Sequence, residues 1–265
     1  GKLRLSDPIT RWLESTVVPN AEDITIEHCL NMTSGLYSYT EDPLLGDPNQ
    51  NTAMIVYTPE ELLRYARMGD PLFKPGDDTA NPIDTVANGM HEWQSRRLPY
   101  WAYTNTGYTL LGLIAEKISG KPFHEEVKRR IFDKLGMDNT IFAVDEKTPP
   151  NMAHGHTGMK EYGVWIDTTV YHVSVAWTAG AVISTSWDML RWYEKLFKTE
   201  DILSKRTFAK MFKMVSTDLV MSSEDYGMGM MEICTESGNC RGHGGTIIGY
   251  LTLCLYYPDY DTYYL

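Results

Sequence analysis

A tyrosine and an asparagine stand two residues apart, directly before a leucine-rich segment of helical pattern. They are Tyr103 and Asn105 in residues 103–108 (YTNTGY). A phenol beside cationic groups has a lowered pKa and can act as a general base, and an asparagine amide can both donate to and accept from a substrate carbonyl group. The alternative is structural: a tyrosine packed in the core and an asparagine that caps the helix.

A second candidate is a histidine flanked by glycines, His243 in residues 241–246 (RGHGGT). Glycines beside a histidine let the backbone approach a ligand closely. The alternative is a tight hairpin turn that carries one exposed histidine. A third short element, residues 33–36 (TSGL), follows a short amphipathic segment that we expect to be helical.

The composition of the chain argues against several classes of protein. The chain has 265 residues, a net charge of −11 and 43% hydrophobic residues, so it can build a sizeable core. An acidic chain argues against nucleic-acid binding, which needs a cationic surface. No run approaches the roughly 20 apolar residues that span a bilayer. The sequence opens at Gly1 without an initiator methionine or an apolar signal region, so we expect processing or a cut before it.

The elements that must position these residues follow from hydrophobic periodicity, capping residues and glycine turns. Helices are predicted over 8–15, 27–32, 58–68, 106–119, 122–135, 186–197 and 204–214. Short strands are predicted over 226–234 and 246–257 and from residue 262, joined by glycine turns. Helices in the middle and strands at the end indicate an α+β fold. Residues 69–100 show no periodicity and indicate a long loop.

The four cysteines show no Cys-x-x-Cys spacing, which excludes a zinc knuckle or a thioredoxin-type motif. Cys234 and Cys240 flank a turn-like stretch and could bridge across it, or both could be free thiols.

Taken in order, these elements resemble the serine β-lactamase-like family: class C β-lactamases, D-Ala-D-Ala carboxypeptidases (penicillin-binding proteins), and their esterase and D-aminopeptidase relatives. The resemblance covers nearly the whole chain. The similar segments are 1–12 (GKLRLSDPITRW), 28–36 (HCLNMTSGL), 72–76 (LFKPG), 103–120 (YTNTGYTLLGLIAEKISG), 179–192 (AGAVISTSWDMLRW) and 241–250 (RGHGGTIIGY). The last has the His-x-Gly form common among relatives that are not lactamases, where true lactamases carry Lys-Thr-Gly.

This resemblance implies one β-lactamase-like domain over residues 1–265, with an antiparallel sheet flanked by helices and truncated at both ends. Residues 16–215 would form its mainly helical part, with an insertion at 77–101, and residues 226–265 its sheet strands.

The chemistry that the resemblance implies is acyl transfer to the serine of a Ser-x-x-Lys motif, on an amide or ester of a small-molecule or peptide-like substrate, without a cofactor. Tyr103 would shuttle protons and Asn105 would bind the substrate amide. His243 would orient the substrate or polarise its carboxylate end. The residues after it, Gly244, Gly245 and Thr246, would line the substrate site. The strand that follows His243 would supply one N–H of the oxyanion hole.

One departure from the family matters most: no serine in this sequence is followed by lysine three residues later. We expect the nucleophile upstream of Gly1. The alternatives are a second chain that completes the sheet, or a non-catalytic relative that acts as a binding or structural protein. By themselves, strands 226–257 would expose a sheet edge and an uncovered face.

The insertion is the second departure. It could form a lid that sets substrate size, with Arg96 or Arg97 meeting a carboxylate and Trp101 touching the substrate, or it could be a solvated surface loop.

A third hypothesis is a zinc hydrolase, because His154, His156 and His172 could ligate zinc by residue type. The family resemblance implies no metal. The family is often extracytoplasmic, which favours that compartment weakly for this chain.

Overall fold

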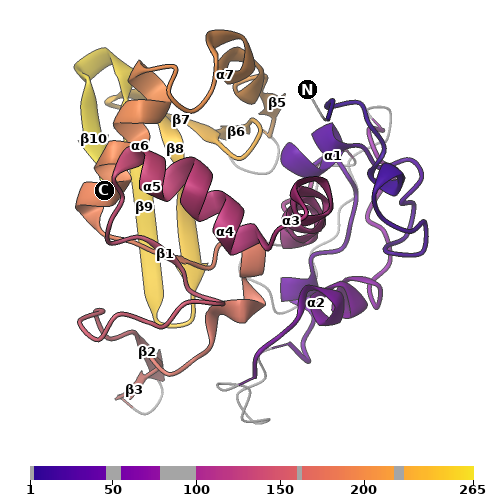
Figure 1. Cartoon of the computed structure of the whole chain (residues 1–265), viewed down its shortest axis with the longest axis horizontal. Helices are drawn as coiled ribbons and strands as arrows, with labels where there is room; N and C mark the ends of the chain where they lie inside the picture. Colours follow the sequence, from indigo (N-terminus) through magenta and orange to yellow (C-terminus); the bar gives the residue numbers. More distant parts are fainter. Residues whose placement is uncertain (1–2, 46–54, 78–99, 160–162, 218–223) are drawn as a thin grey trace.

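The computed structural model describes residues 3–45, 55–77, 100–159, 163–217 and 224–265. Arg96, Arg97 and most of the predicted lid lie outside these residues. The described chain has a mainly helical part beside an antiparallel sheet, with helices from the middle of the sequence lying against that sheet (Figure 1). The α+β fold is therefore confirmed.

The helical part is organised around α3 (Asn105–Ser119), the predicted leucine-rich helix. Its side chains Leu110 and Ile114 are fully buried because apolar residues recur three to four positions apart. Thr104 caps the N-terminus through its side-chain oxygen, and Gly120 ends the helix in the left-handed conformation with a φ of 71°. These local signals predict both ends of the helix to within one residue.

Two shorter helices pack beside α3. Helix α1 (Ile26–Leu30) lies so close that a Cβ on Gly107 would stand 3.1 Å from the carbonyl oxygen of Cys29. Helix α2 (Pro59–Ala66) begins with a capping box between Thr58 and Glu61. Both helices bring apolar side chains to the core that surrounds α3.

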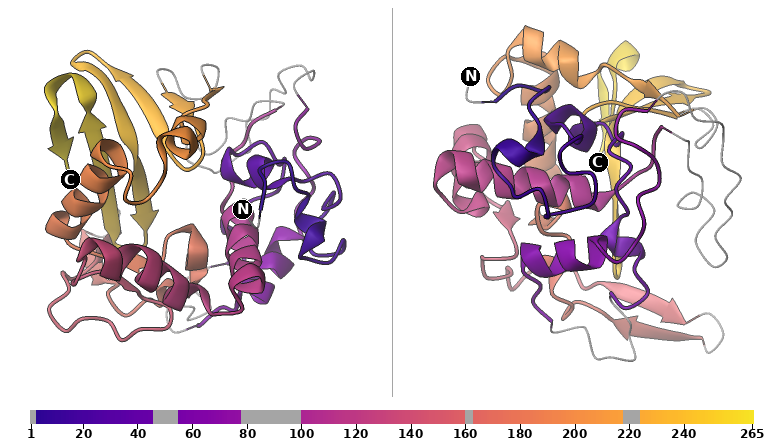
Figure 2. Two further views of the ribbon diagram at one scale, coloured as in Figure 1. Left: turned by 45° about the horizontal axis from the view of Figure 1, so that its top comes forward. Right: turned by 90° about the vertical axis from the view of Figure 1, so that its right-hand side faces the viewer.

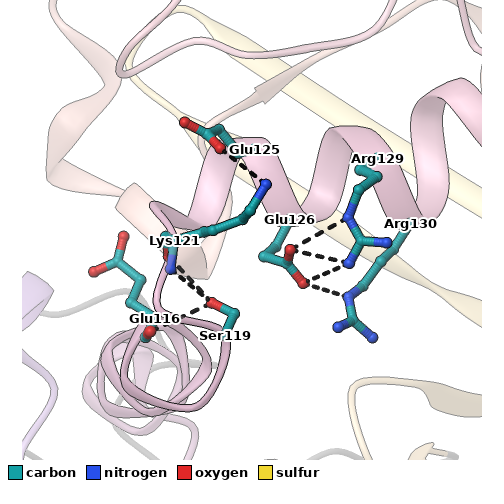
Figure 3. Close-up of polar contacts among 7 residues, drawn as sticks. All are labelled: Glu116, Ser119, Lys121, Glu125, Glu126, Arg129 and Arg130. Carbon is teal, nitrogen blue, oxygen red and sulfur yellow. Dashed lines mark hydrogen bonds and ion pairs between the residues drawn. The ribbon is translucent and has the colours of Figure 1, made fainter.

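The predicted helix over 122–135 is interrupted in the structure. It consists of α4 (Phe123–Val127), a π-helical turn (Lys128–Phe132) and α5 (Asp133–Leu135). At the corner before it, the Glu116 carboxylate accepts a hydrogen bond from the Phe123 N–H at 2.7 Å. Figure 3 shows Glu126 accepting hydrogen bonds from Arg129 and Arg130, which holds the turn in place.

A six-stranded antiparallel sheet of order β10-β9-β8-β7-β6-β5 forms the other part. Its strands are β5 (Val215–Ser216), β6 (Glu224–Tyr226), β7 (Met231–Thr235), β8 (Gly238–Ile247), β9 (Tyr250–Tyr257) and β10 (Thr262–Tyr264). The predicted strand over 226–234 is wrong in its interior, because Gly227 and Gly229 lie in a turn between β6 and β7.

The sequence predicts a glycine turn, not a strand, between residues 234 and 246, and this is also wrong because β8 spans Gly238–Ile247. Gly242 lies inside β8 and pairs with Met231 of β7 on one side and Leu255 of β9 on the other. A Cβ at Gly242 would stand 1.9 Å from the carbonyl oxygen of Cys254, so this position requires glycine for close strand packing. The hairpin turn lies further on, at Gly249, which has a φ of 83°.

Helices α6 (Ser186–Lys198) and α7 (Lys205–Met211) lie on one face of the sheet, where Tyr193 and Leu196 are buried against residues of β9 and β10 (Figures 1 and 2). On β9, by contrast, Leu251 is 82% exposed and Leu253 is 43% exposed. Two leucines of β9 therefore face solvent, whereas Leu255 further along the strand is buried.

Two two-stranded antiparallel pairings complete the fold. Strand β1 (Ile141–Phe142) pairs with β4 (Val182–Ile183), and β2 (His156–Met159) pairs with β3 (Val164–Asp167). The predicted helix over 8–15 is wrong, because this segment forms only a 3-10 turn at Ile9–Arg11. Further 3-10 turns lie at Tyr39–Glu41, Val173–Val175, Trp177–Ala179 and Pro258–Tyr260. In the described part of the chain, no helix is both long and apolar enough to span a membrane.

The cysteines are free thiols in the structure. Cys240 is buried opposite Ile233, whereas Cys234 is exposed opposite Asn239. Neighbouring positions on a strand project to opposite faces, so these two side chains do not face each other across the hairpin. Of the two alternatives for this pair, the structure has the free thiols.

Candidate active site

Tyr103 and His243, which 140 positions of sequence separate, come together where the helical part meets the sheet. Tyr103 immediately precedes the cap of α3, and His243 lies in the middle of β8. The centroids of their rings are 6.1 Å apart with the planes tilted by 44°. The structure thus brings together the two ring-bearing residues that the sequence analysis selected as catalytic candidates.

Tyr226, the last residue of β6, completes this group. Its hydroxyl lies 3.2 Å from Nε2 of His243, and its ring packs edge-on against Tyr103 with centroids 6.1 Å apart. The sequence analysis missed Tyr226. Its only local signal is a position before the Gly227 turn, whereas its contacts with His243 depend on strand pairing between distant residues.

The group rests on a buried support made of Met32 and Trp101. Met32 is 1% exposed, and its backbone adopts a φ of 66°, which is unusual for a residue with a side chain. Its carbonyl accepts from the Ala102 N–H at 3.1 Å, and its sulfur accepts from the Thr104 N–H at 3.4 Å. Trp101 is 1% exposed and packs on Tyr226 at 5.8 Å, so it supports the site from within the core and is not placed on an open lid.

Asn105 is half-buried and begins α3. Its backbone N–H donates to Ser38 Oγ at 3.1 Å, and its side-chain Nδ2 donates to Thr40 Oγ1 at 3.1 Å. The cap of the helix is Thr104, so the structural alternative for Asn105 as a capping residue does not hold. Its side chain is instead oriented by the Ser38–Thr40 turn.

The three residues after His243 on β8 differ in the space around them and in their distance from the ring group. A Cβ at Gly244 would find its nearest atom at 3.6 Å, an ordinary contact, whereas a Cβ at Gly245 would stand 2.6 Å from the Thr252 hydroxyl. Thr246 is exposed and pairs with Leu251 near the end of the hairpin, about 10 Å along the strand from His243. Of these three residues after His243, which the resemblance predicted to line the substrate site, Gly244 is the nearest to the ring group and Thr246 the farthest.

Burial dominates the electrostatics of the site. It raises the pKa of Tyr103 to about 12 and that of Tyr226 well above its usual value of 10. Burial also lowers the pKa of His243, against a smaller opposite effect from the Gly244 carbonyl. The lowered tyrosine pKa expected from the sequence is therefore not found among the described residues, because burial favours the neutral phenol.

The histidines considered as zinc ligands make other contacts. His154 Nδ1 lies 2.7 Å from Asp167 Oδ2, and His172 Nδ1 accepts from the Ser174 N–H at 3.2 Å. Among the residues whose positions are described, no three histidine, cysteine or carboxylate side chains gather as a metal site requires.

Comparison with known proteins decides the family. The model of the family described as Beta-lactamase matches residues 1–81 and 83–264, which is almost the entire chain. This chain belongs to the β-lactamase family. The resemblance found from the sequence motifs is thereby confirmed.

The curated relatives point to the same family. A penicillin-binding protein of Bacillus subtilis is 26% identical over 98% of this chain and 54% of its own length. The β-lactamase of Escherichia coli is 26% identical over 77% of this chain and 44% of its own length. The chain thus spans about half the length of the curated relatives that it matches.

Solved structures extend the similarity to amidohydrolases. A D-stereospecific amidohydrolase from Streptomyces sp. has a TM-score of 0.82 at 28% identity, covering 99% of this chain and 74% of that one. The D-amino acid amidase from Ochrobactrum anthropi, solved with L-phenylalanine amide, has a TM-score of 0.78 at 26% identity, covering 98% of this chain and 68% of that one. The β-lactamase-like fold is therefore shared over almost the whole chain.

Proposed function

We propose that this protein is a serine hydrolase that acts on an amide or ester through an acyl-enzyme. The observation that carries the proposal is the meeting of Tyr103 with His243 at 6.1 Å, each from a family motif in its expected order along the chain. Membership of the β-lactamase family and similarity to amidohydrolases support the same reaction class.

In this proposal the nucleophilic serine comes from outside these 265 residues, because no Ser-x-x-Lys occurs among them. The lysine of that motif has a specific task. Tyr103 in its buried position has a raised pKa and holds its proton at neutral pH. A lysine ammonium beside the phenol would favour the phenolate and let Tyr103 accept the proton of the serine hydroxyl.

Asn105 and His243 line opposite sides of the substrate site in this mechanism. The Asn105 amide, held by its hydrogen bond to Thr40, presents its oxygen and its second N–H to the substrate amide. His243 forms the opposite wall on β8, and the backbone beside it is free of side chains at Gly244. The substrate class we propose is a small or peptide-like amide or ester.

The competing proposal is a catalytically inactive binding protein that retains this site. The observation in its favour is that the 265 residues contain no Ser-x-x-Lys. Both proposals use the same geometry, and they differ in whether a serine in the intact protein can be acylated.

The test is intact-mass spectrometry of the natural protein before and after treatment with a fluorophosphonate and, separately, with benzylpenicillin. The hydrolase proposal predicts one covalent adduct, and peptide mapping should place it on a serine outside residues 1–265. A protein that forms no adduct with either probe would leave the binding protein as the better account. An adduct on a residue within 1–265 would show that the nucleophile has been misplaced.

A further inference from the structure

Both ring nitrogens of His243 are engaged within the protein. Nδ1 lies 2.5 Å from the carbonyl oxygen of Gly244, and Nε2 lies 3.2 Å from the hydroxyl of Tyr226. A histidine that binds a substrate through its ring needs at least one nitrogen free for that contact. In this arrangement neither nitrogen is free.

The chemistry of the two partners determines which nitrogen carries the proton. A carbonyl oxygen can only accept a hydrogen bond, so Nδ1 of His243 must be the N–H donor toward Gly244. In a neutral ring the other nitrogen then bears a lone pair, and Nε2 accepts from the Tyr226 hydroxyl. Tyr226 is able to donate because burial keeps its phenol protonated.

In the part of the chain that the structure describes, no charged group contributes to the shift in the pKa of His243. Among the described residues, Tyr226 on β6 and Tyr103 before α3 contact the ring of His243, Cys254 lies directly opposite on β9, and Tyr193 on α6 interacts with the His243 backbone. None of these four is a carboxylic acid, and burial disfavours a charged ring. The geometry and the surroundings therefore agree on a neutral His243.

We propose that Tyr226 is a positioning residue that holds His243 as the neutral Nδ1–H imidazole, so that this wall of the site accepts an uncharged group of the substrate and not a carboxylate. The part about the substrate rests on the proposed hydrolase function. Its physical basis is that a carboxylate leaving water needs a cation or free N–H donors, and His243 offers neither. A terminal carboxamide or ester carries no such requirement. This differs from the role at a substrate carboxylate that the family resemblance implied for His243.

The state of the ring can be measured without any enzymatic activity. The intact protein, labelled with ¹⁵N in its histidine rings, is studied by two-bond ¹H–¹⁵N correlation spectra at pH 7, and the signals lost in His243→Gln assign the ring. We expect the pattern of a neutral ring protonated at Nδ1. A ring protonated at Nε2, or an imidazolium at pH 7, would overturn the proposal.

The role of Tyr226 is tested by a matched pair of tyrosine variants. Tyr226→Phe removes the donor to Nε2 and should move the Nε2 resonance of His243. Tyr250→Phe removes a hydroxyl on the neighbouring strand that donates to the Ala153 carbonyl, and should leave that resonance in place. Equal spectra from the two variants would refute the role of Tyr226. If Tyr226→Phe does not fold, the Nε2 resonance of the wild-type ring decides instead: a position typical of an Nε2 without a hydrogen bond would refute the role of Tyr226.

The substrate preference is measured on paired peptides that differ only in a terminal carboxamide or carboxylate. We expect kcat/KM to favour the carboxamide by about tenfold or more, and His243→Lys to shift this ratio toward the carboxylate by a similar factor, because it supplies a cation. Equal or better turnover of the carboxylate by the wild type would contradict the preference. A protein inactive on both peptides would count against the proposed hydrolase function, while the spectra would still decide the state of His243.

Discussion

The two walls of the candidate site are built in different ways. On the helical side, Tyr103 and Asn105 flank Thr104, which caps α3 through the Thr106 N–H, and the distant Ser38–Thr40 turn then orients Asn105. On the sheet side, His243 is fixed by pairing with β7 and β9 and by the hydroxyl of Tyr226. The comparison teaches that the first wall can be predicted from a local motif, whereas the second depends on contacts between distant strands.

The largest effect is expected from Tyr103→Phe on the helical wall. If Tyr103 shuttles the proton of the serine nucleophile, the acylation rate of the intact protein should fall by about 10²- to 10⁴-fold. The free energy of unfolding should change by less than about 1 kcal/mol, since the ring that packs on Tyr226 is retained. Stopped-flow or mass-resolved acylation measures the rate, and Tyr250→Phe is the control. Equal rates for the two variants would remove Tyr103 from the chemistry.

The second-largest effect is expected on the stability of the sheet side of the site. Gly242→Ala would place a Cβ 1.9 Å from the backbone oxygen of Cys254, which cannot move without breaking the pairing of β8 with β9. We expect a loss of about 3 kcal/mol or more in the free energy of unfolding, measured by denaturant titration.

The matched control is Gly244→Ala, two residues away on the same strand. Its Cβ would find its nearest atom at 3.6 Å, an ordinary contact, so the change should stay within about 1 kcal/mol. Equal losses at the two glycines would show that the close approach of the strands at Gly242 is not what requires glycine there.

These differences explain how much the sequence could predict. The capping threonine, the leucine stripe and Gly120 define α3 by local physical chemistry, and its predicted bounds agree with the structure. The glycines around His243 carry no such local meaning. They are typical of turns, but here Gly242 serves the close approach of β9, a contact with residues more than ten positions away. Tyr226 was missed for the same reason.

A smaller effect is expected from Thr104→Ala at the start of α3. Its side-chain oxygen accepts from the Thr106 N–H at 3.2 Å, and losing such a cap costs about 1 kcal/mol. Thr104→Ser retains the oxygen and should recover most of the loss in a thermal or denaturant melt. If the serine variant is as unstable as the alanine variant, then packing of the threonine methyl group, and not the cap, stabilises this end of the helix.

The smallest expected effect is the contribution of His243, on the sheet side of the site, to the pH dependence of folding stability. The pKa of His243 is lower in the folded protein than its usual value, so the unfolded chain binds the proton more readily. The stability due to the neutral ring is therefore complete above the unfolded pKa and is lost as the pH falls below it. We expect acidification from pH 7 to pH 5 to destabilise the wild type more than His243→Gln. An equal pH dependence in the two proteins would show that His243 is not held neutral by folding.

The most direct test of the central claim, that the two walls act in one active site, is a double-mutant cycle between Tyr103→Phe and His243→Gln. The measured quantity is the second-order rate constant for acylation of the intact protein by a fluorophosphonate. The account predicts that the two effects are coupled by about 0.5–3 kcal/mol, as for residues that share one site. Effects that add to within about 0.5 kcal/mol would contradict it, because the rings of Tyr103 and His243 would then meet in the structure without acting together.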